Sequence, residues 1–346
     1  MHASDDKQPP LPDPAIVLDL LDAFRRSKTM FAAVSLGVFD ILSTKGPQSL
    51  QSIAADLQAN TDTLERLLDA CVGLQLLART DAIYHNTPLA AAYLCKGSPN
   101  TITGYIGYSN SVLWKLWGNL EYATREGTNR WKQTYGWEGP IFDHFFRDEA
   151  SRRDFLLGMH GFGVISSPHV VAAFDLSRFR HLVDLGGATG HLAIAACQRY
   201  PELRATVFDL PGASEIAKEI VGASPVADRV KVLAGDFFTD ALPEGDLFAV
   251  GRILHDWSEG KILTLLRKAF ERLPSGGGLL IAEKLLDDDK LGPRSAQMQS
   301  LNMLVCTEGK ERTLAEYERL VKQAGFAGIV GRRTNSPLDA LLAAKG

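Results

Sequence analysis

Features that would assign the chain to an extracellular or membrane class are scarce. The 346 residues contain only four cysteines, at positions 71, 95, 197 and 306. Their wide spacing, without a C-x-x-C pair, indicates free thiols in a reducing compartment. No apolar run reaches the roughly 18 residues that a membrane span needs. The stretch from Met1 to Pro14 is polar and proline-rich and lacks the apolar core of a signal peptide. We therefore expect a cytoplasmic protein.

A strong surplus of one charge is also missing. The formal net charge is −4, with no basic tail or block, which argues against nucleic acid or an anionic membrane as the main partner. With 45% apolar and 23% charged residues, the composition is that of a globular protein. The length is enough for two domains of ordinary size.

The first hundred residues predict a helical domain with a hairpin. Apolar residues recur at helical spacing over 15–42, interrupted by Gly37, and again over 49–57 and 62–77. Residues 78–87 alternate between apolar and polar in the way of a hairpin. Helix, turn, helix and hairpin in this order give the outline of a winged helix.

A winged helix can read DNA, but the charge of this one argues against it. The helix that would enter the groove carries Asp62, Glu65 and Asp69 against Arg66 alone, and this acidic surplus would repel phosphate. We therefore interpret residues 15–100 as a dimerisation domain that uses the winged-helix outline for packing.

The segment 101–175 is predicted to link the domains and to contribute to a substrate pocket. Flat side chains at this density can line a site for a planar molecule, or can simply pack in a core or interface. The tryptophans and tyrosines concerned are Trp114, Trp117, Trp131, Trp137, Tyr105, Tyr108, Tyr122 and Tyr135.

From residue 176 to the C-terminus, strand and helix patterns alternate. This order predicts an α/β fold with a doubly wound, largely parallel sheet. Thr313 and Glu316 form the capping box of a helix over 313–324, which stops at Gly325. Strands are expected near 181–186, 204–209, 229–234, 246–253, 278–285, 327–333 and 338–343.

The stretch 181–190 is the most informative one in the chain. A buried strand leads into Asp184 and then into a glycine-rich turn that begins at Gly186 and Gly187. Open α/β sheets bind ligands where such strands end, and glycine lets the backbone approach a ligand closely. The next strand ends in Asp209, which is placed to accept hydrogen bonds from ribose hydroxyls. The pattern therefore predicts a nucleoside site.

Three interpretations of this turn remain open at this point. A dinucleotide fingerprint needs G-x-G-x-x-G, but Ala188 and His191 stand where its second and third glycines belong. An acid followed by G-G-x-x-G favours S-adenosylmethionine (SAM) over NAD. The third interpretation is a turn that binds no ligand.

The best candidate for proton transfer is His255, just beyond the fourth strand. Imidazole titrates near neutral pH and can accept a proton there. Glu283 at the end of the next strand and Glu311 before a later helix can converge on it and fix its tautomer. Asp256 can do the same, or can instead cap the helix that begins near Ser258.

Two further acidic groups are ambiguous. Asp236 and Phe237 follow the third strand and can hydrogen-bond and stack on an adenine, or can be an ordinary loop acid beside a core aromatic. The run Asp287–Asp289 has three consecutive acids in a loop. Such runs are usually solvated, so we predict no metal site.

A family resemblance becomes clear at this point. The segments Gly235-Asp-Phe-Phe, Leu254-His-Asp-Trp, Ser300-Leu-Asn-Met-Leu-Val and Thr307-Glu-Gly-Lys-Glu-Arg-Thr occur in this order. Together they resemble the small-molecule O-methyltransferases, most of all the acetylserotonin O-methyltransferases and their methyltransferase-like relatives. The plant caffeic acid type is similar, though less so. The resemblance extends from about residue 15 to the C-terminus and is strongest over 175–345.

The resemblance implies a helical dimerisation domain followed by a seven-stranded SAM-binding domain, without a metal. It also implies the site residues. On the cofactor side, Gly186 matches the family's loop glycine, Asp209 and Leu210 match the ribose contacts, Asp236 and Phe237 match the adenine contacts, and Arg252 matches a position beside the cofactor. On the acceptor side, His255 matches the general base, Glu283 and Glu311 match the acids that flank the base, and Asp256 matches the acid that follows it.

The resemblance is less specific about the acceptor. Met159, His160, Phe162 and Gly163 align with a pocket stretch, and Gly163 falls where the acetylserotonin enzymes have a tryptophan. This substitution predicts a gap, so we expect a hydroxyindole such as N-acetylserotonin to be a poor substrate and a larger polycyclic phenol or hydroxyquinone to be preferred.

The resulting hypothesis is a homodimeric enzyme that methylates a small aromatic hydroxyl and releases S-adenosylhomocysteine (SAH). The alternatives are a nucleoside-sensing winged-helix regulator that is not an enzyme, and an NAD-dependent oxidoreductase.

Overall fold

The computed structural model describes residues 11–139, 141–146 and 148–346. The chain divides into two units, residues 1–99 and 100–346, so the segment 101–175 lies within the second unit. Most of the stretch from Met1 to Pro14, where we expect no signal peptide, lies outside the described residues.

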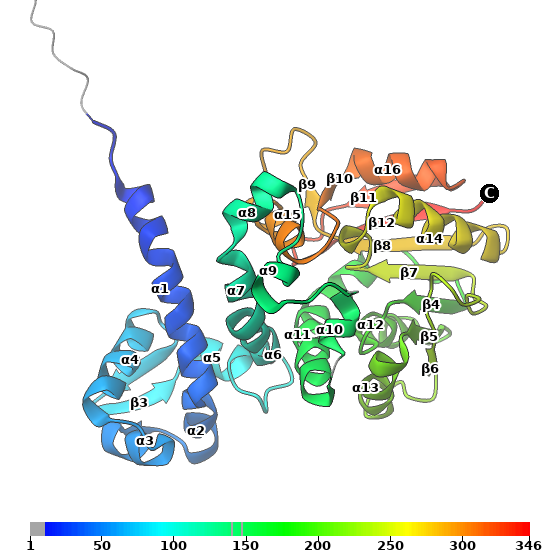
Figure 1. Ribbon diagram of the computed structural model, residues 1–346. Coiled ribbons are helices and arrows are strands. Elements are labelled where there is room, and N and C mark those ends of the chain that lie inside the picture. The colour runs from blue at the N-terminus through cyan, green and yellow to red at the C-terminus, as the bar shows by residue number, and fades with distance from the viewer. Residues whose placement is uncertain (1–10, 140, 147) are drawn as a thin grey trace, which may run out of the picture. The chain divides into compact units, whose positions relative to one another are not determined.

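The first unit consists of helices around a small antiparallel sheet with the strand order β1-β3-β2 (Figure 1). Gly37 ends the first helix in the left-handed conformation, at φ 81°, as its position in the pattern suggested. The Ser49 and Asn60 side chains cap α3 and α4 by accepting backbone N–H groups. The elements are α1 (Ala15–Leu36), α2 (Val38–Lys45), β1 (Gln48–Ser49), α3 (Leu50–Leu57), α4 (Thr61–Gly73), β2 (Leu77–Thr80), β3 (Ile83–Asn86) and α5 (Pro88–Tyr93).

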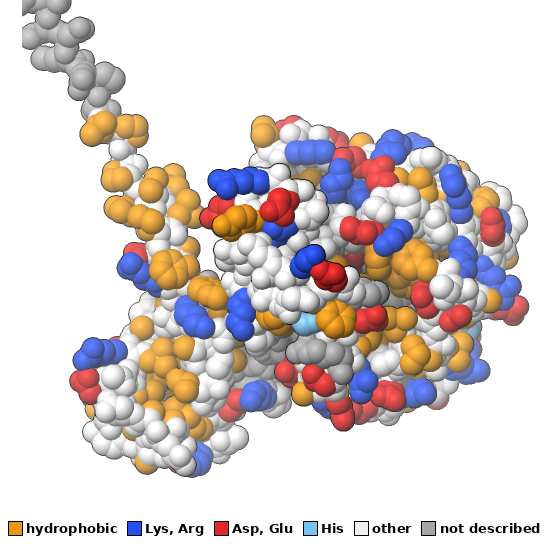
Figure 2. Space-filling view, in the orientation of Figure 1, with side chains coloured by type: hydrophobic (Ala, Val, Ile, Leu, Met, Phe, Trp, Pro, Cys, Tyr) orange, Lys and Arg blue, Asp and Glu red, His pale blue; other side chains and the backbone are white. Residues whose placement is uncertain are grey.

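The first half of α1 exposes large apolar side chains to solvent. Figure 2 shows them as an orange strip along this helix. Each of these side chains is between 55% and 75% exposed, although burying each fully would contribute about 1.5–3 kcal/mol. The residues of this strip, called the α1 strip below, are Ile16, Val17, Leu18, Leu20, Leu21 and Phe24.

The second unit begins with short helices and one long helix. In α11 the glycines let backbones approach closely. A Cβ on Gly158 would lie 3.2 Å from the Tyr105 backbone nitrogen, and one on Gly104 would lie 2.8 Å from that of Gly158. The elements are α6 (Thr103–Tyr108), a π-helical turn η1 (Ser109–Leu113), α7 (Trp114–Trp117), α8 (Leu120–Glu126), α9 (Trp131–Tyr135), α10 (Ile141–Phe145) and α11 (Glu149–Ala172).

Among the described helices, α11 alone is long and apolar enough to cross a membrane. The structure packs it against α6 and α12 (His191–Arg199), and Val170 and Val171 belong to the core of the unit. A core helix passes the same test of length and composition, so α11 is no argument for a membrane span.

The rest of the second unit is a seven-stranded sheet with the order β11-β12-β8-β7-β4-β5-β6. Six of the seven strands run in the same direction, and β12 alone among them runs the other way, paired antiparallel with β8 and β11. This arrangement confirms the predicted α/β class. The strands are β4 (His181–Leu185), β5 (Arg204–Asp209), β6 (Val230–Ala234), β7 (Leu247–Gly251), β8 (Gly278–Glu283), β11 (Ala327–Arg332) and β12 (Asp339–Ala344).

The sheet is buried on both faces because successive strand residues point to opposite sides. Leu182 joins the core beside α12 and α13 (Pro211–Gly222), whereas Val183 joins the core beside α14 (Glu259–Arg272) and α16 (Leu314–Gln323). Figure 1 shows these helix pairs on the two faces. The expected capping box of Thr313 and Glu316 is present at the start of α16. The remaining elements are η2 (Leu254–Asp256), β9 (Leu285–Leu286), α15 (Arg294–Cys306) and β10 (Arg312–Thr313).

Candidate active site

The predicted site residues follow the carboxyl ends of neighbouring strands. β4, β5, β7 and β8 are parallel, so the turns after them lie along one edge of the sheet. The strand order reverses between β4 and β7, and ligands of open α/β sheets bind at such a switch point. The glycine-rich turn follows one of these two strands, and His255 follows the other.

The glycine-rich turn is held by close contacts. Gly186 has φ 68°, and a Cβ there would lie 2.4 Å from Ile253 Cδ1 and 3.2 Å from the Phe237 ring. A Cβ on Gly187 would lie 2.7 Å from the Asp184 carboxylate. The turn therefore needs glycine at both positions, and Asp184 and Phe237 both lie against it.

Asp184 lies behind this turn and is 2% exposed. Its Oδ2 atom has no hydrogen-bond partner among the described residues. Burial raises the pKa of Asp184 to about 7. A buried carboxyl oxygen without a partner costs free energy unless a ligand or water supplies one. This atom and the glycine turn fit a nucleoside ligand.

Asp209 stands at the end of β5 and binds the turn from the other side. Its Oδ2 accepts the Ala188 N–H at 2.7 Å, and its Oδ1 accepts the Leu210 N–H at 2.7 Å. Burial raises the pKa of Asp209 to about 6, although these two hydrogen bonds oppose the shift. The carboxylate retains lone pairs that can accept ribose hydroxyls.

The third strand end supplies Asp236 and Phe237. Oδ1 of Asp236 accepts the Phe238 N–H at 2.8 Å, so this carboxylate shapes its own loop. The Phe237 ring lies beside Gly186 and tilts against Phe238, with ring centroids 4.8 Å apart. Of the two, Phe237 is thus the one in contact with the glycine-rich turn.

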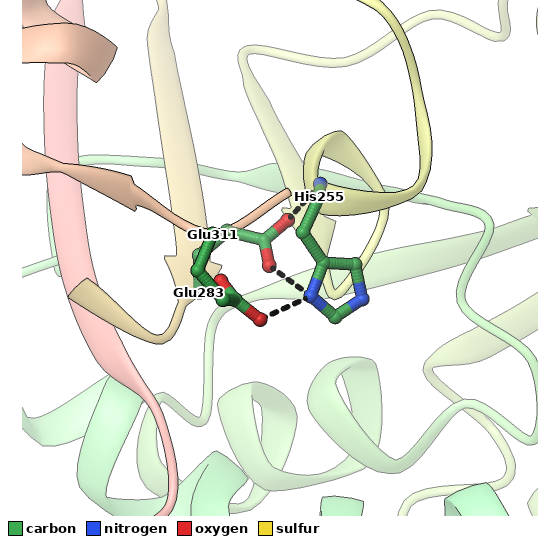
Figure 3. A group of neighbouring side chains, drawn as sticks. All are labelled: His255, Glu283 and Glu311. Atoms are coloured by element: carbon green, nitrogen blue, oxygen red, sulfur yellow. Dashed lines mark hydrogen bonds and ion pairs between the residues drawn. The ribbon is translucent and has the colours of Figure 1, made fainter. Parts of the chain in front are cut away.

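His255 meets its two predicted acids in the interior, as Figure 3 shows. Glu311 Oε1 lies 2.7 Å from the imidazole Nδ1, and Glu283 Oε2 lies 3.4 Å from it. The exposed fractions of the three residues are at most 3%. Because both glutamates face Nδ1, this nitrogen carries the proton and donates it to Glu311. In the neutral form of His255, Nε2 then has the free lone pair that a proton acceptor requires.

Glu283 has a different task from Glu311. Its Oε1 accepts the backbone N–H groups of Ile253 at 3.0 Å, Leu254 at 2.8 Å and His255 at 3.4 Å. The side chain therefore holds the turn that carries His255. Glu311 makes the shorter contact with the imidazole itself.

Asp256 lies on the other side of the ring. Its Oδ1 is 3.7 Å from Nε2 of His255, and α14 begins after Ser258 without a side-chain cap. Burial raises the pKa of Asp256 to about 6. The structure places this acid beside the imidazole of His255 and not at the cap of α14.

Charge in the cluster favours the imidazolium. Burial alone would lower the pKa of His255, but Glu283, Glu311 and Asp256 outweigh it and raise the pKa to about 9. Burial raises the pKa of Glu283 to about 7, against the opposing effect of His255. The cluster thus stabilises the protonated form of His255.

Among the described residues, the group formed by His255, Glu283 and Glu311 is also the one with a geometry that can hold a metal ion. The 2.7 Å contact between Nδ1 of His255 and Oε1 of Glu311 has the length of a charge-assisted hydrogen bond between these two atoms. In the Asp287–Asp289 run, Asp287 pairs with Arg333, and Asp289 accepts the Leu291 N–H.

The aligned pocket residues lie on α11, and two of them meet the rest of the site. The Arg252 guanidinium lies 5.4 Å from the centroid of the Phe162 ring, and Phe162 packs on Tyr105 at 4.6 Å. Arg252 itself has φ 57°, an unusual conformation for a residue with a side chain. Met159 packs against the aromatic cluster of α6, α9 and α10.

The gap expected at Gly163 is absent. A Cβ on this residue would lie 2.2 Å from the ring of His191, so the imidazole already fills the space beside Gly163. The inference of extra room for a polycyclic acceptor was therefore wrong. Sequence reasoning overlooked His191 because it treated the residue only as a missing glycine, although its place at the first helical position after the turn put it beside the site.

The tryptophans of residues 101–140 serve packing more than a pocket. Nε1 of Trp117 donates to Asn302 at 2.8 Å, and Nε1 of Trp131 donates to the Cys306 carbonyl at 2.6 Å. Both bonds join this segment to α15, while Trp114 is 37% exposed.

Comparisons with known proteins agree on one family. Residues 117–327 match the model of the O-methyltransferase domain, and residues 18–96 match that of the O-methyltransferase dimerisation domain. The chain is 41% identical over 338 residues to acetylserotonin O-methyltransferase of Gallus gallus, covering 96% of this chain and 97% of that protein.

Two further relatives extend the comparison. The chain is 40% identical over 346 residues to a probable bifunctional dTTP/UTP pyrophosphatase/methyltransferase protein of Homo sapiens; the match covers 99% of this chain but spans 55% of that longer protein. The fold of this chain is similar to that of human N-acetylserotonin methyltransferase in complex with SAM. The TM-score is 0.92, with 37% identity over the whole of both chains.

Proposed function

The chain belongs to the SAM-dependent O-methyltransferases with a dimerisation domain, and we propose that His255 is the general base of methyl transfer to a small aromatic hydroxyl. The observation that carries the proposal is the 2.7 Å contact between Nδ1 of His255 and Glu311. It leaves Nε2 as the proton acceptor. The match over residues 117–327 removes the reason for the NAD-dependent and regulatory alternatives.

Bound SAM supplies an electrophilic methyl group. Phenols ionise near pH 10, so little phenolate is present at neutral pH. Nε2 of His255 takes the hydroxyl proton while the oxygen attacks the methyl carbon and the carbon–sulfur bond breaks. Glu311 and Glu283 stabilise the resulting imidazolium. The products are a methyl ether, SAH and a protonated His255, which returns its proton to solvent.

The proposed SAM contacts follow the geometry of the turns. Asp209 and Leu210 contact the ribose of SAM, and Phe237 and Asp236 contact its adenine. The glycine-rich turn after Asp184 contacts the remainder of the SAM molecule. No residue of the cluster around His255 needs a metal for this chemistry. The accompanying expectation is that activity survives prolonged chelation with EDTA.

The acceptor is proposed to be a planar hydroxyl compound of hydroxyindole or phenol size. Rings from α6, α10 and α11 lie close together: Phe145 stacks on Phe155 at 4.1 Å, and Tyr108 meets Phe155 edge-on at 5.6 Å. Aromatic side chains of this kind recognise planar molecules. The name of the Gallus gallus relative makes N-acetylserotonin the first compound to test.

A homodimer is proposed on two grounds. Residues 18–96 match a dimerisation domain, and the α1 strip offers apolar surface for a second copy. Light scattering should give twice the mass of the chain, and a stable monomer would contradict the proposal. A cytoplasmic location is proposed because all four cysteines are free and buried.

The test of the function compares His255→Ala with the unchanged enzyme. With [methyl-³H]SAM and a panel of hydroxyindoles and phenols, His255→Ala should lower kcat by about 10² or more. The Kd of SAH should stay within a few-fold, because His255 serves the acceptor. Near-normal kcat at neutral pH would sink the assignment.

A further inference from the structure

Two imidazole–hydroxyl hydrogen bonds join α11 to the glycine-rich turn and to the start of α12. The Nδ1 atom of His160 lies 2.8 Å from Oγ1 of Thr189, and Oγ of Ser167 lies 2.9 Å from Nδ1 of His191. His160 and Ser167 are two helical turns apart and therefore lie on one face of α11. The proposed chemistry uses neither bond.

Both bonds lie in the interior, where losing one partner is costly. Thr189 is fully buried, and Ser167 is 2% exposed. Burial lowers the pKa of His160. The pKa of His191 is lowered to about 3, mainly by burial and less by the charges of nearby groups. Neutral imidazoles have one N–H and one lone pair, so each can pair with a hydroxyl without a counter-charge.

Thr189 occupies a critical place in the turn. Ala188 has φ 48° and Gly190 has φ 80°, so a left-handed residue precedes Thr189 and another follows it. Such a backbone persists only where its surroundings hold it. The Ala188 N–H is fixed by Asp209, and the Thr189 side chain is fixed by α11.

The same helix reaches the acceptor side of the site. Phe162, two residues after His160, packs on Tyr105 and lies below the Arg252 guanidinium. Phe155, one turn earlier than Met159, belongs to the ring cluster of α6 and α10. α11 is therefore in contact with the turn proposed for SAM and with the rings proposed for the acceptor.

We propose that His160 and Thr189 are positioning residues: through their hydrogen bond α11 holds the glycine-rich turn in the form that binds SAM, so that SAM binding and acceptor binding are linked through this helix. The inference rests on the proposed function, because it requires SAM at this turn. Linkage of this kind is reciprocal. A variant that makes the turn less ordered should therefore also reduce the effect of SAM binding on the affinity for the acceptor, and the effect of the acceptor on the affinity for SAM.

Thr189→Val is the sharpest test, because valine keeps the branched shape and removes the hydroxyl. In titration calorimetry with SAH on the full chain, its Kd should rise about five- to tenfold, the range for one lost hydrogen bond in a buried site. His160→Phe, which keeps a flat ring, should have a similar effect. The double variant should be no weaker than either single one, because both remove the same bond.

The matched control is Ser166→Ala on the same helix. Oγ of Ser166 donates to the Phe162 carbonyl of α11 itself at 2.9 Å, and in the described part of the chain it has no partner on another element. This variant should leave the Kd of SAH unchanged. If Thr189→Val does not fold, Ser167→Ala removes the neighbouring bond to His191 and should raise the Kd in the same direction.

A merely structural role would lower the melting temperature without changing ligand affinity. For the positioning role, KM for SAM must rise more than kcat falls. Unchanged Kd in Thr189→Val, or additive effects in the double variant, would overturn the inference while leaving the function intact. If the unchanged protein fails to bind SAH, the proposed function itself fails.

Discussion

The Nδ1 atom of His255 lies 2.7 Å from Oε1 of Glu311, and both side chains are almost completely buried. This contact fixes which nitrogen of the base is free. The acids around it also make the imidazolium more stable than it would be in water, so His255 is mostly protonated at neutral pH.

The pH dependence of the reaction follows from this. Only neutral His255 can accept a proton, and the acids raise its pKa to about 9. The raised pKa means that the protonated form predominates below pH 9, so kcat/KM should rise with pH through that value. Glu311→Gln removes one negative neighbour, so the rising limb should move to lower pH while the maximal kcat falls. Rates with an acceptor from the panel, measured across about four pH units, check this.

The control for that experiment is Glu308→Gln. Glu308 lies three residues before Glu311 and binds Ser258 and Lys261 at the surface. Its replacement should leave the limb in place. If the rising part of the pH profile stays at the same pH in Glu311→Gln, this result would contradict the role assigned to Glu311.

Glu283 should matter for the stability of the fold as well as for the protonation of His255. Glu283→Gln keeps an oxygen that can accept the three N–H groups of residues 253–255, and we expect near-normal stability. Glu283→Leu leaves those groups buried without a partner, at about 1–3 kcal/mol each. Denaturant unfolding should therefore separate the two variants by several kcal/mol. Equal stability of the two would show that Glu283 does not anchor the turn.

Asp209 should matter for SAM and little for the acceptor. Asp209→Ala should weaken SAH binding by about 1.5–3 kcal/mol, the range for hydrogen bonds to a charged group. Calorimetry on the full chain measures it. Asp246→Ala is the comparison: this acid binds the backbone of Arg180 and His181, so its loss should lower the melting temperature without changing the affinity for SAH. Unchanged SAH affinity in Asp209→Ala would reject the ribose contact.

Gly163 should not tolerate a side chain. Gly163→Ala places a methyl group 2.2 Å from the His191 ring, and overpacking of this kind costs about 1–3 kcal/mol. The cost should shrink in a His191→Ala background, where the ring is gone. Thermal unfolding of the two single variants and the double variant checks the pairing. A Gly163→Ala variant as stable as the unchanged protein would refute it.

The strands and their order along the chain could be predicted because the pattern is local. Residues 204–209 form an apolar strand pattern between two helical patterns, and this local pattern is enough to identify the strand. β5 has these bounds. The capping box at Thr313 depends on two residues three positions apart and was equally accessible.

Contacts between distant segments could not be predicted in the same way. His255 and Glu311 are 56 positions apart, and nothing in their spacing says which of two glutamates faces Nδ1. The Gly163 expectation failed for the same reason. An alignment reports which residue is missing at a position, but not that a ring 28 positions further along, at His191, takes its space.

The glycine contact between α6 and α11 has a mechanical consequence. With Gly104 and Gly158 against each other, the two backbones leave no side-chain layer between them that could deform. α6 and α11 must then shift as one piece. Any ligand that displaces one helix displaces the other by the same amount, so a distance label on each would record a constant separation while both move against the sheet.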